Sequence, residues 1–215
     1  MTLNIAPPSG PEAIVRDILH GLSEGRYAPG QRLIEPDLMV RYGVGRSTVR
    51  EALGRLAAGG VVTQAPHRGA RIRLLTRRAT GDLLRVAEML LGLAARQAAE
   101  AVGDGADPEP LSQAAELYAT ANAGNESRAR ARYYRALIEL SSNVELERLL
   151  PAVQVHLIRA QLRAARSTVH DERATLVAAI RAALPDAAEA AARTPTARLI
   201  ASLDAIPDSA FAPEQ

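Results

Sequence analysis

The residues of this chain best suited to binding chemistry lie in the run GVGRSTVREALGRLAA, from residue 43 to residue 58. Three apolar residues recur there at helical spacing and share one face: Val49, Leu53 and Leu56. Polar side chains with donor groups lie away from that face, near the start of the helix: Arg46, Ser47, Thr48 and Arg50. Guanidinium groups pair with guanine edges and grip phosphates, and hydroxyls can take either role. The run therefore predicts a helix that can enter a DNA major groove, and a solvated surface helix is the alternative.

The composition of the 215-residue chain limits what can surround this helix. Hydrophobic residues make up 47% of it and aromatic residues only 3%, which favours a core of Leu, Ala, Val and Ile in helices. The chain has no cysteine, which excludes disulfides and thiolate metal sites. It has no apolar run of transmembrane length and no signal-peptide pattern, so we expect a cytoplasmic protein without membrane contact.

Charge is divided unevenly along the chain. Residues 1–78 carry twelve arginines and six acids, a net charge of +6, whereas residues 79–215 carry fourteen arginines and eighteen acids, a net charge of −4. A basic first third joined to an acidic remainder indicates that only the first part contacts nucleic acid.

The order of elements in the first third predicts a winged helix-turn-helix. A helix starts at Pro11 and reaches Gly25, and a short helix runs from about residue 36 to residue 42 before the arginine-rich helix. Two strands, at residues 61–63 and 71–74, then form a hairpin whose tip is QAPHRGA. This fold places its third helix in the major groove and its wing beside the backbone or minor groove. The alternative is a winged helix used for protein contacts alone.

Residues 14–74 resemble the N-terminal domain of GntR-family bacterial transcription regulators. The resemblance is carried by GRYAPGQRL (25–33), YGVGRSTVREAL (42–53) and HRGARI (67–72). It implies DNA contacts by residues of the first matching run, the third helix and the wing tip: Arg32, Arg46, Ser47, Thr48, Arg50, His67, Arg68 and Gly69.

The remainder of the chain is expected to be helical almost throughout. We expect a flexible tail (1–10), a winged helix-turn-helix domain (11–75), a linker (76–81), an all-helical domain for effector binding and dimerisation (82–206) and a second flexible tail (207–215). The helices are predicted at 82–102, 111–122, 126–141, 143–167 and 170–184, with Pro185 and Pro195 as interruptions. The fold class is therefore mainly α, with one small β-hairpin.

The helical part resembles the FCD effector domain of the FadR-like GntR branch, through the runs at 83–100, 130–146 and 176–192. Such domains commonly hold a divalent metal with one Asp and three His. Those positions fall on Arg130, Tyr134, Arg173 and a residue near Ala197, so the resemblance implies that the metal site is lost and that no cofactor is bound. His156 and His170 leave open a rearranged metal site.

If Arg130 and Arg173 face the bundle interior, they favour an anion there, and Tyr134 and Asn143 could add hydrogen bonds. The alternative is that both arginines pair with acids across the bundle. Enzyme motifs, including GxSxG, a phosphate loop and HExxH, are absent from the sequence, so we expect no enzyme.

Taken together, the residues and the resemblance predict a homodimeric transcription regulator on a palindromic operator. We expect a repressor released by a small organic acid. A dimerisation or adaptor protein that does not bind DNA is the alternative.

Overall fold

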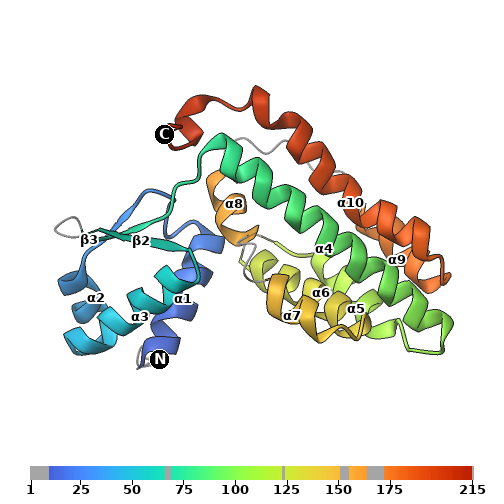
Figure 1. Ribbon diagram of the computed structural model, residues 1–215. Coiled ribbons are helices and arrows are strands. Elements are labelled where there is room, and N and C mark those ends of the chain that lie inside the picture. Colours follow the sequence, from blue (N-terminus) through green and yellow to red (C-terminus); the bar gives the residue numbers. More distant parts are fainter. Residues whose placement is uncertain (1–9, 66–68, 123, 151–154, 164–171, 215) are drawn as a thin grey trace. The chain divides into compact units, whose positions relative to one another are not determined.

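The computed structural model describes residues 10–65, 69–122, 124–150, 155–163 and 172–214, and the chain falls into two compact units (Figure 1). One unit combines the N-terminal residues up to Leu74 with residues 156–163, and the other contains the rest of the chain.

The N-terminal unit is built on three helices that pack around one small core. They are α1 (Pro11–Glu24), α2 (Glu35–Tyr42) and α3 (Arg46–Ala58). Apolar side chains from all three helices and from the following strands are almost completely buried: Ile14, Ile18, Leu22, Leu38, Val49, Leu53, Leu56 and Ile72. Because α1 and α2 both pack on α3, the inner face of α3 is buried, and its outer face remains exposed.

This unit also contains a three-stranded antiparallel sheet of order β1-β3-β2, whose first strand lies between α1 and α2 in the chain. Its strands are β1 (Arg32–Leu33), β2 (Val62–Ala65) and β3 (Gly69–Ile72). Val62 pairs with Ile72 in the expected hairpin, and Arg32 pairs with Arg71 in the added strand. The two residues of β1 were not predicted, because so short a strand shows no alternation.

A polar network ties α1 to α2 around the Asp17 carboxylate. Tyr42 donates its hydroxyl to Asp17 over 2.6 Å, and Arg26 donates to the same carboxylate over 2.9 Å. Burial raises the pKa of Asp17, but the hydrogen bonds from Arg26 and Tyr42 outweigh it and hold that pKa below its usual value. Burial and the bond to Asp17 raise the pKa of Tyr42.

Helix α8 (Val155–Gln161) groups with the N-terminal unit although it comes from the second half of the sequence. The Leu157 and Ile158 side chains of α8 are completely buried. Just beyond the helix, Arg163 donates to the carbonyl oxygens of Leu22 and Ser23 over 2.7 and 2.8 Å. These carbonyls lie at the C-terminal end of α1, where a cation is favourable. The single helix expected at 143–167, wholly within the helical domain, is therefore wrong.

The other unit is a helical bundle in which the long helix α4 packs along α10. Its helices are α4 (Arg77–Gly103), α5 (Glu109–Ala119), α6 (Glu126–Leu140), α7 (Val144–Leu149), α9 (Arg173–Arg181) and α10 (Pro185–Ser202). Small and branched apolar side chains form one continuous core, including Ala94, Ala95, Ala98, Leu111, Leu137, Leu146, Ile180 and Ala188. The mainly α fold with a small sheet is thus confirmed.

Close contact between α4 and α10 depends on small residues and on ion pairs at the rim. A Cβ at Gly92 would lie 2.9 Å from Cγ of Arg193, so only glycine leaves room for that side chain. Arg193 then donates to Glu88 over 3.1 Å, and Arg96 donates to Glu189 over 2.6 Å.

Three expectations for this unit are wrong. The expected linker at 76–81 forms the start of α4, whose N-cap is the Thr76 side chain. Pro195 does not interrupt the chain but stands inside α10, where packing against α4 offsets the lost backbone donor.

The third expectation concerns the C-terminal tail. Residues 207–214 are packed on the start of α4 instead of forming a flexible tail. Phe211 is 7% exposed, the Arg77 guanidinium lies 4.4 Å from the centre of its ring, and Ala212 donates to the Leu75 carbonyl over 3.0 Å. This short sequence, with two prolines and a single large apolar side chain, shows no helical or strand period, which is why the packing was not predicted.

None of the helices in the described part of the chain has the length and apolar character needed to cross a membrane.

Candidate nucleic-acid interface and helical-unit sites

The turn between α2 and α3 places the first residues of α3 outside the hydrophobic core. Gly43 ends α2 in the left-handed conformation, with φ of +62°, which a residue with a side chain rarely adopts. Gly45 then takes the N-cap position of α3 without a side-chain bond. The first backbone N–H groups of α3 and the positive end of its dipole thus lie beside the polar side chains of its first turn.

The two faces of α3 differ as the sequence predicts. Val49 is completely buried, whereas Ser47 and Arg50 are exposed and Thr48 is half-buried. Arg46 has a side chain that is 74% exposed, and its Nε donates to Glu35 of α2 over 3.0 Å. The structure therefore brings all four predicted residues of α3 to one exposed end of the helix.

The wing is the second part of this interface. Gly69 begins β3 with φ of +72°, and a Cβ placed on it would lie 3.7 Å from the guanidinium of Arg32. Arg32, on β1, is thus brought to the wing by its pairing with β3. Predicted wing residues His67 and Arg68 lie outside the described residues.

The predicted effector residues of the helical unit are only partly brought together. The Arg173 guanidinium lies 3.9 Å from the centre of the Tyr118 ring. The centres of the Tyr118 and Tyr133 rings lie 6.0 Å apart, and those of the Tyr133 and Tyr134 rings lie 5.3 Å apart. Arg173 and Tyr134 therefore belong to one aromatic cluster, which joins α5, α6 and α9.

Two other predicted residues have different roles. Arg130, whose side chain is 13% exposed, forms an ion pair with Glu126 at 3.6 Å, which is the pairing considered as the alternative to a ligand. Asn143 caps α7 by accepting hydrogen bonds from two backbone N–H groups, and its amide donates to Gln97 over 2.9 Å. Because both ends of the Asn143 amide are used structurally, its proposed role in ligand binding loses support.

The described residues contain no group of three or more His, Asp or Glu side chains placed to hold a metal. Ala197, near the last of the ligand positions that the FCD resemblance implies, is exposed on α10, and His170 lies outside the described residues.

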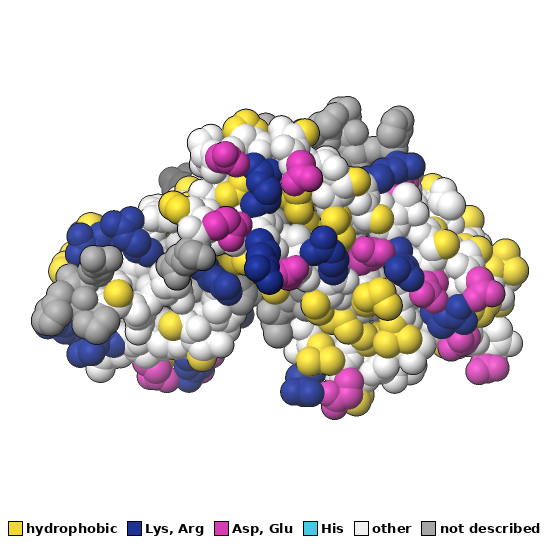
Figure 2. All heavy atoms as spheres, turned by 45° about the horizontal axis from the view of Figure 1, so that its top comes forward, with side chains coloured by type: hydrophobic (Ala, Val, Ile, Leu, Met, Phe, Trp, Pro, Cys, Tyr) yellow, Lys and Arg dark blue, Asp and Glu magenta, His cyan; other side chains and the backbone are white. Residues whose placement is uncertain are grey.

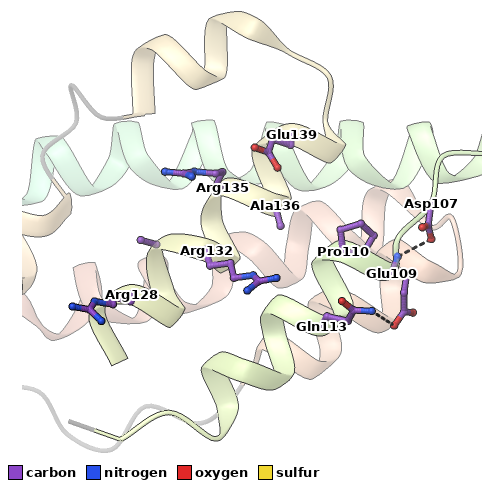
Figure 3. A pocket seen from close by; sticks show the side chains of 10 residues that line it. Asp107, Glu109, Pro110, Gln113, Arg128, Arg132, Arg135, Ala136 and Glu139 are labelled. Carbon is purple, nitrogen blue, oxygen red and sulfur yellow. Dashed lines mark hydrogen bonds between the residues drawn. The ribbon is translucent and has the colours of Figure 1, made fainter. Parts of the chain in front are cut away.

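An open cleft of about 670 Å³ lies between α6 and the start of α5 (Figure 3). Three arginines from successive turns of α6 line it, Arg128, Arg132 and Arg135, together with Glu139 near the end of the same helix. Asp107 and Glu109 stand at the α5 end. Figure 3 shows the Arg132 side chain extending toward Glu109 and Gln113. This cleft was not predicted. The signal for it was the density of arginines in SRARARYYR (127–135), which we interpreted only through Arg130.

Three helices, with exposed arginines at the start of the third, followed by a two-stranded wing, define a winged helix-turn-helix domain. Residues 11–72 match the family model of the gntR family of bacterial regulatory proteins. This match covers the winged helix-turn-helix fold, which is less than a third of the chain.

The chain is also similar to curated HTH-type transcription regulators over part of their length. The chain is 30% identical over 145 residues to YdhC of Bacillus subtilis (strain 168), named as an uncharacterized HTH-type transcriptional regulator, and the match covers 63% of each protein. It is 39% identical over 61 residues to the HTH-type transcriptional repressor RspR of Escherichia coli (strain K12), covering 28% of this chain and 25% of RspR.

Solved structures extend the likeness to the whole fold. A GntR protein from Rhodococcus sp. RHA1 has a TM-score of 0.72 at 21% identity, and McbR/YncC of E. coli has one of 0.73 at 19% identity. Each match covers 92% of this chain and 98% of the other. At this identity the likeness concerns the fold, with its winged domain and helical bundle.

Proposed function

We propose that the chain is a DNA-binding transcription regulator whose helical unit responds to a small acidic metabolite. The observation that carries the first half is the exposed start of α3, where Arg46, Ser47 and Arg50 stand on a helix held by a fully buried inner face. Such a surface suits base edges and phosphates of a major groove. The net charge of +6 on residues 1–78 adds attraction to any duplex.

The finer assignment is a repressor of the FadR-like branch with an FCD-type effector domain. It is supported by the helical architecture of the second unit and by the sequence runs that resemble that domain. Arg173 and Arg130 offer guanidinium groups to a carboxylate or phosphate in place of a metal. The two arginines already have neighbours in Tyr118 and Glu126, so an anion must compete with these contacts.

Substitutions on α3 test the DNA-binding proposal. A bound sequence is first selected from a random duplex pool with the full-length protein, and affinity is then measured by fluorescence titration at several salt concentrations. Arg46→Ala and Arg50→Ala should each weaken specific binding by about 1–3 kcal/mol. Arg135→Ala, an exposed arginine on α6, is the matched control and should leave affinity unchanged.

An adaptor protein that does not bind DNA remains the competing proposal. It is favoured if no sequence is selected from the pool, or if both α3 variants bind the selected duplex as tightly as the unaltered protein.

A further inference from the structure

The cleft between α5 and α6 is lined by three arginines that have no partner among the residues that the structure describes. Arg128, Arg132 and Arg135 are exposed on α6, and none of them forms a hydrogen bond, an ion pair or a ring contact with a described residue. Their separations of four and three residues put them on one side of the helix. We call these three residues the α6 arginine row.

The α6 arginine row is an exception within the helical unit. Every other arginine described there has an acidic or aromatic partner, such as Glu189 for Arg96 and Tyr118 for Arg173. On the face drawn in Figure 2, basic side chains of this unit accordingly stand beside acidic ones. Three arginines without such partners, gathered in one cleft, indicate a surface that suits an anion from another molecule.

The positions of these arginines weaken the helix that carries them. Arg128 and Arg132 are four residues apart, and Arg132 and Arg135 are three apart, so like charges are neighbours along α6, which is unfavourable. Arg128 also lies in the first turn of α6, where the helix dipole disfavours a cation. An anion bound along the row would offset both effects.

The carboxylates of the cleft do not neutralise the row. Glu139 stands one turn after Arg135, but no ion pair joins them. Asp107 accepts a hydrogen bond from the backbone N–H of Glu109, and Glu109 forms an ion pair with Arg181 at 3.2 Å. The cleft therefore has a basic half along α6 and an acidic half where α6 ends and α5 begins (Figure 3).

We propose that the α6 arginine row binds an acidic segment of a partner protein. Along the helix axis the three arginines are about 6 and 4.5 Å apart. An extended segment repeats its side chains on one side about every 6.6 Å, so alternate acidic residues can reach successive arginines. Each carboxylate can then accept two parallel hydrogen bonds from a guanidinium group. A basic residue that follows the acidic ones faces the acidic half of the cleft.

The lining of the cleft favours a protein segment over a small ligand. Its apolar contacts are limited to Pro110, Ala131 and Ala136, and all three arginines are open to water. Small-molecule sites instead bury most of their ligand, largely against apolar side chains. A partner protein needs no such enclosure, because its binding energy is spread over a wider surface.

The acidic half of the cleft disfavours nucleic acid. A nucleic-acid backbone carries a phosphate at every position, so phosphates beyond the row would meet Asp107 and Glu139. Residues 79–215 also carry a net charge of −4, which repels a polyanion at longer range. A protein segment avoids this repulsion because its charge can change sign along its length.

Fluorescence polarisation with the full-length protein tests the proposal. The probe is a labelled synthetic peptide in which three glutamates alternate with serines and a lysine follows, and the same peptide with glutamine in place of glutamate is its control. The glutamate peptide should bind saturably and more weakly as salt is added, whereas the glutamine peptide should not bind. Arg132→Ala should weaken binding about threefold, and Ala at all three positions of the row about thirtyfold.

A variant of equal net charge controls for general electrostatic attraction. Arg78, Arg85 and Arg148 are exposed arginines of the same unit outside the cleft, and their combined replacement by Ala should leave peptide affinity within about twofold. Circular dichroism and melting temperature establish that both triple variants are folded. An equal loss of affinity in the two triple variants, or no saturable binding by the unaltered protein, would overturn the proposal.

Charge exchange tests direct contact at the centre of the row. The peptide whose middle glutamate is replaced by lysine should bind the unaltered protein more weakly than the original peptide does. Arg132→Glu should reverse that order, because opposite charges then meet again. If the order of the two peptides is the same for both proteins, the middle glutamate does not contact Arg132 and the proposed register is wrong.

Competition separates the other anions from a protein segment. If citrate or phosphate displaces the peptide at a lower concentration than unlabelled peptide does, the cleft is a small-anion site. If the row variant also loses affinity for random-sequence duplex while the control variant does not, the row is a nucleic-acid surface. Either result would contradict the proposal.

This inference goes beyond the proposed function and is independent of it. Loss of peptide binding in the row variant should leave the sequence-specific DNA binding of α3 intact, and Arg50→Ala should leave peptide binding unchanged.

Discussion

Arg46, the first residue of α3, donates its Nε–H to the carboxylate of Glu35, the first residue of α2, over 3.0 Å. This bond ties the starts of the two helices together and uses one of the five donors of the guanidinium. The side chain is nevertheless 74% exposed. Glu35 therefore holds the guanidinium of Arg46, and if Arg46 binds DNA as proposed, Glu35 places a negative charge close to that DNA.

Glu35→Ala should reduce discrimination between DNA sequences. Loss of the carboxylate removes repulsion of phosphates, which raises affinity for nonspecific duplex, and it frees Arg46 to move, which lowers affinity for the selected sequence. We expect the ratio of specific to nonspecific affinity to fall a few-fold, the size of an exposed ion pair. Glu51→Ala is the control, because Glu51 pairs with Arg55. An unchanged ratio for Glu35→Ala would show that Arg46 needs no orienting partner.

Stability at acidic pH should depend on Asp17. Its pKa is lowered in the folded protein because hydrogen bonds from Arg26 and Tyr42 outweigh the effect of burial. A lowered carboxyl pKa stabilises the folded state above the unfolded pKa of about 3.9, and this contribution is lost as the pH falls through the folded pKa. Asp17→Asn should be less stable at neutral pH and should lose less stability on acidification.

Chemical denaturation followed by circular dichroism between pH 7 and pH 3 would measure this. Asp37→Asn, which removes an exposed carboxylate from α2 of the same unit, is the matched control. Parallel stability curves for Asp17→Asn and the unaltered protein would mean that Asp17 does not set the acid sensitivity.

The winged domain was predictable because its signals are local. Gly43 requires a left-handed turn, Val49 and its neighbours repeat at helical spacing, and Gly69 marks the wing, so each element is specified by residues within a few positions. The arrangement of α8 depends instead on contacts across the sequence. Arg163 binds carbonyl groups of α1 more than a hundred residues away, and no periodicity in residues 143–167 reveals that partner.

The candidate effector residues were harder to predict for a related reason. We predicted a ligand contact for Asn143 from its position in the sequence. An Asn side chain can also cap a helix, and Asn143 caps α7 in the structure. The cleft beside Arg132 arises from how α5 and α6 meet, which neither helix encodes separately.

The C-terminal segment should contribute to the stability of the helical unit. Phe211 is buried under Arg77, and Arg77 also donates to the carbonyl of Ile206 over 2.6 Å. Phe211→Ala should lower the free energy of unfolding by about 2–4 kcal/mol, through lost apolar burial and a residual cavity. Phe211→Leu should recover most of that loss. Denaturant titration gives both values, and an unchanged stability for Phe211→Ala would mean that the segment is a free tail.

The final prediction is that the effector response depends on arginine and not on a divalent metal. The positions that resemble the family's metal ligands hold Arg130, Tyr134, Arg173 and Ala197. A divalent cation there would meet fixed positive charge, whereas a carboxylate or phosphate would gain charge-assisted hydrogen bonds. Elemental analysis of the purified protein should find no stoichiometric Zn, Ni or Mn, and a chelator should not lower the melting temperature.

Anions test the same site, because their charge is opposite to that of a metal ion. In a panel of succinate, malate, citrate and phosphate, an acid that binds should raise the melting temperature by mass action. Arg173→Ala should abolish this rise, whereas Arg132→Ala should leave it unchanged because Arg132 lines the separate cleft between α5 and α6. Loss of the rise in Arg132→Ala alone would move the effector into that cleft. One metal ion held tightly per chain would contradict the arginine-based site altogether.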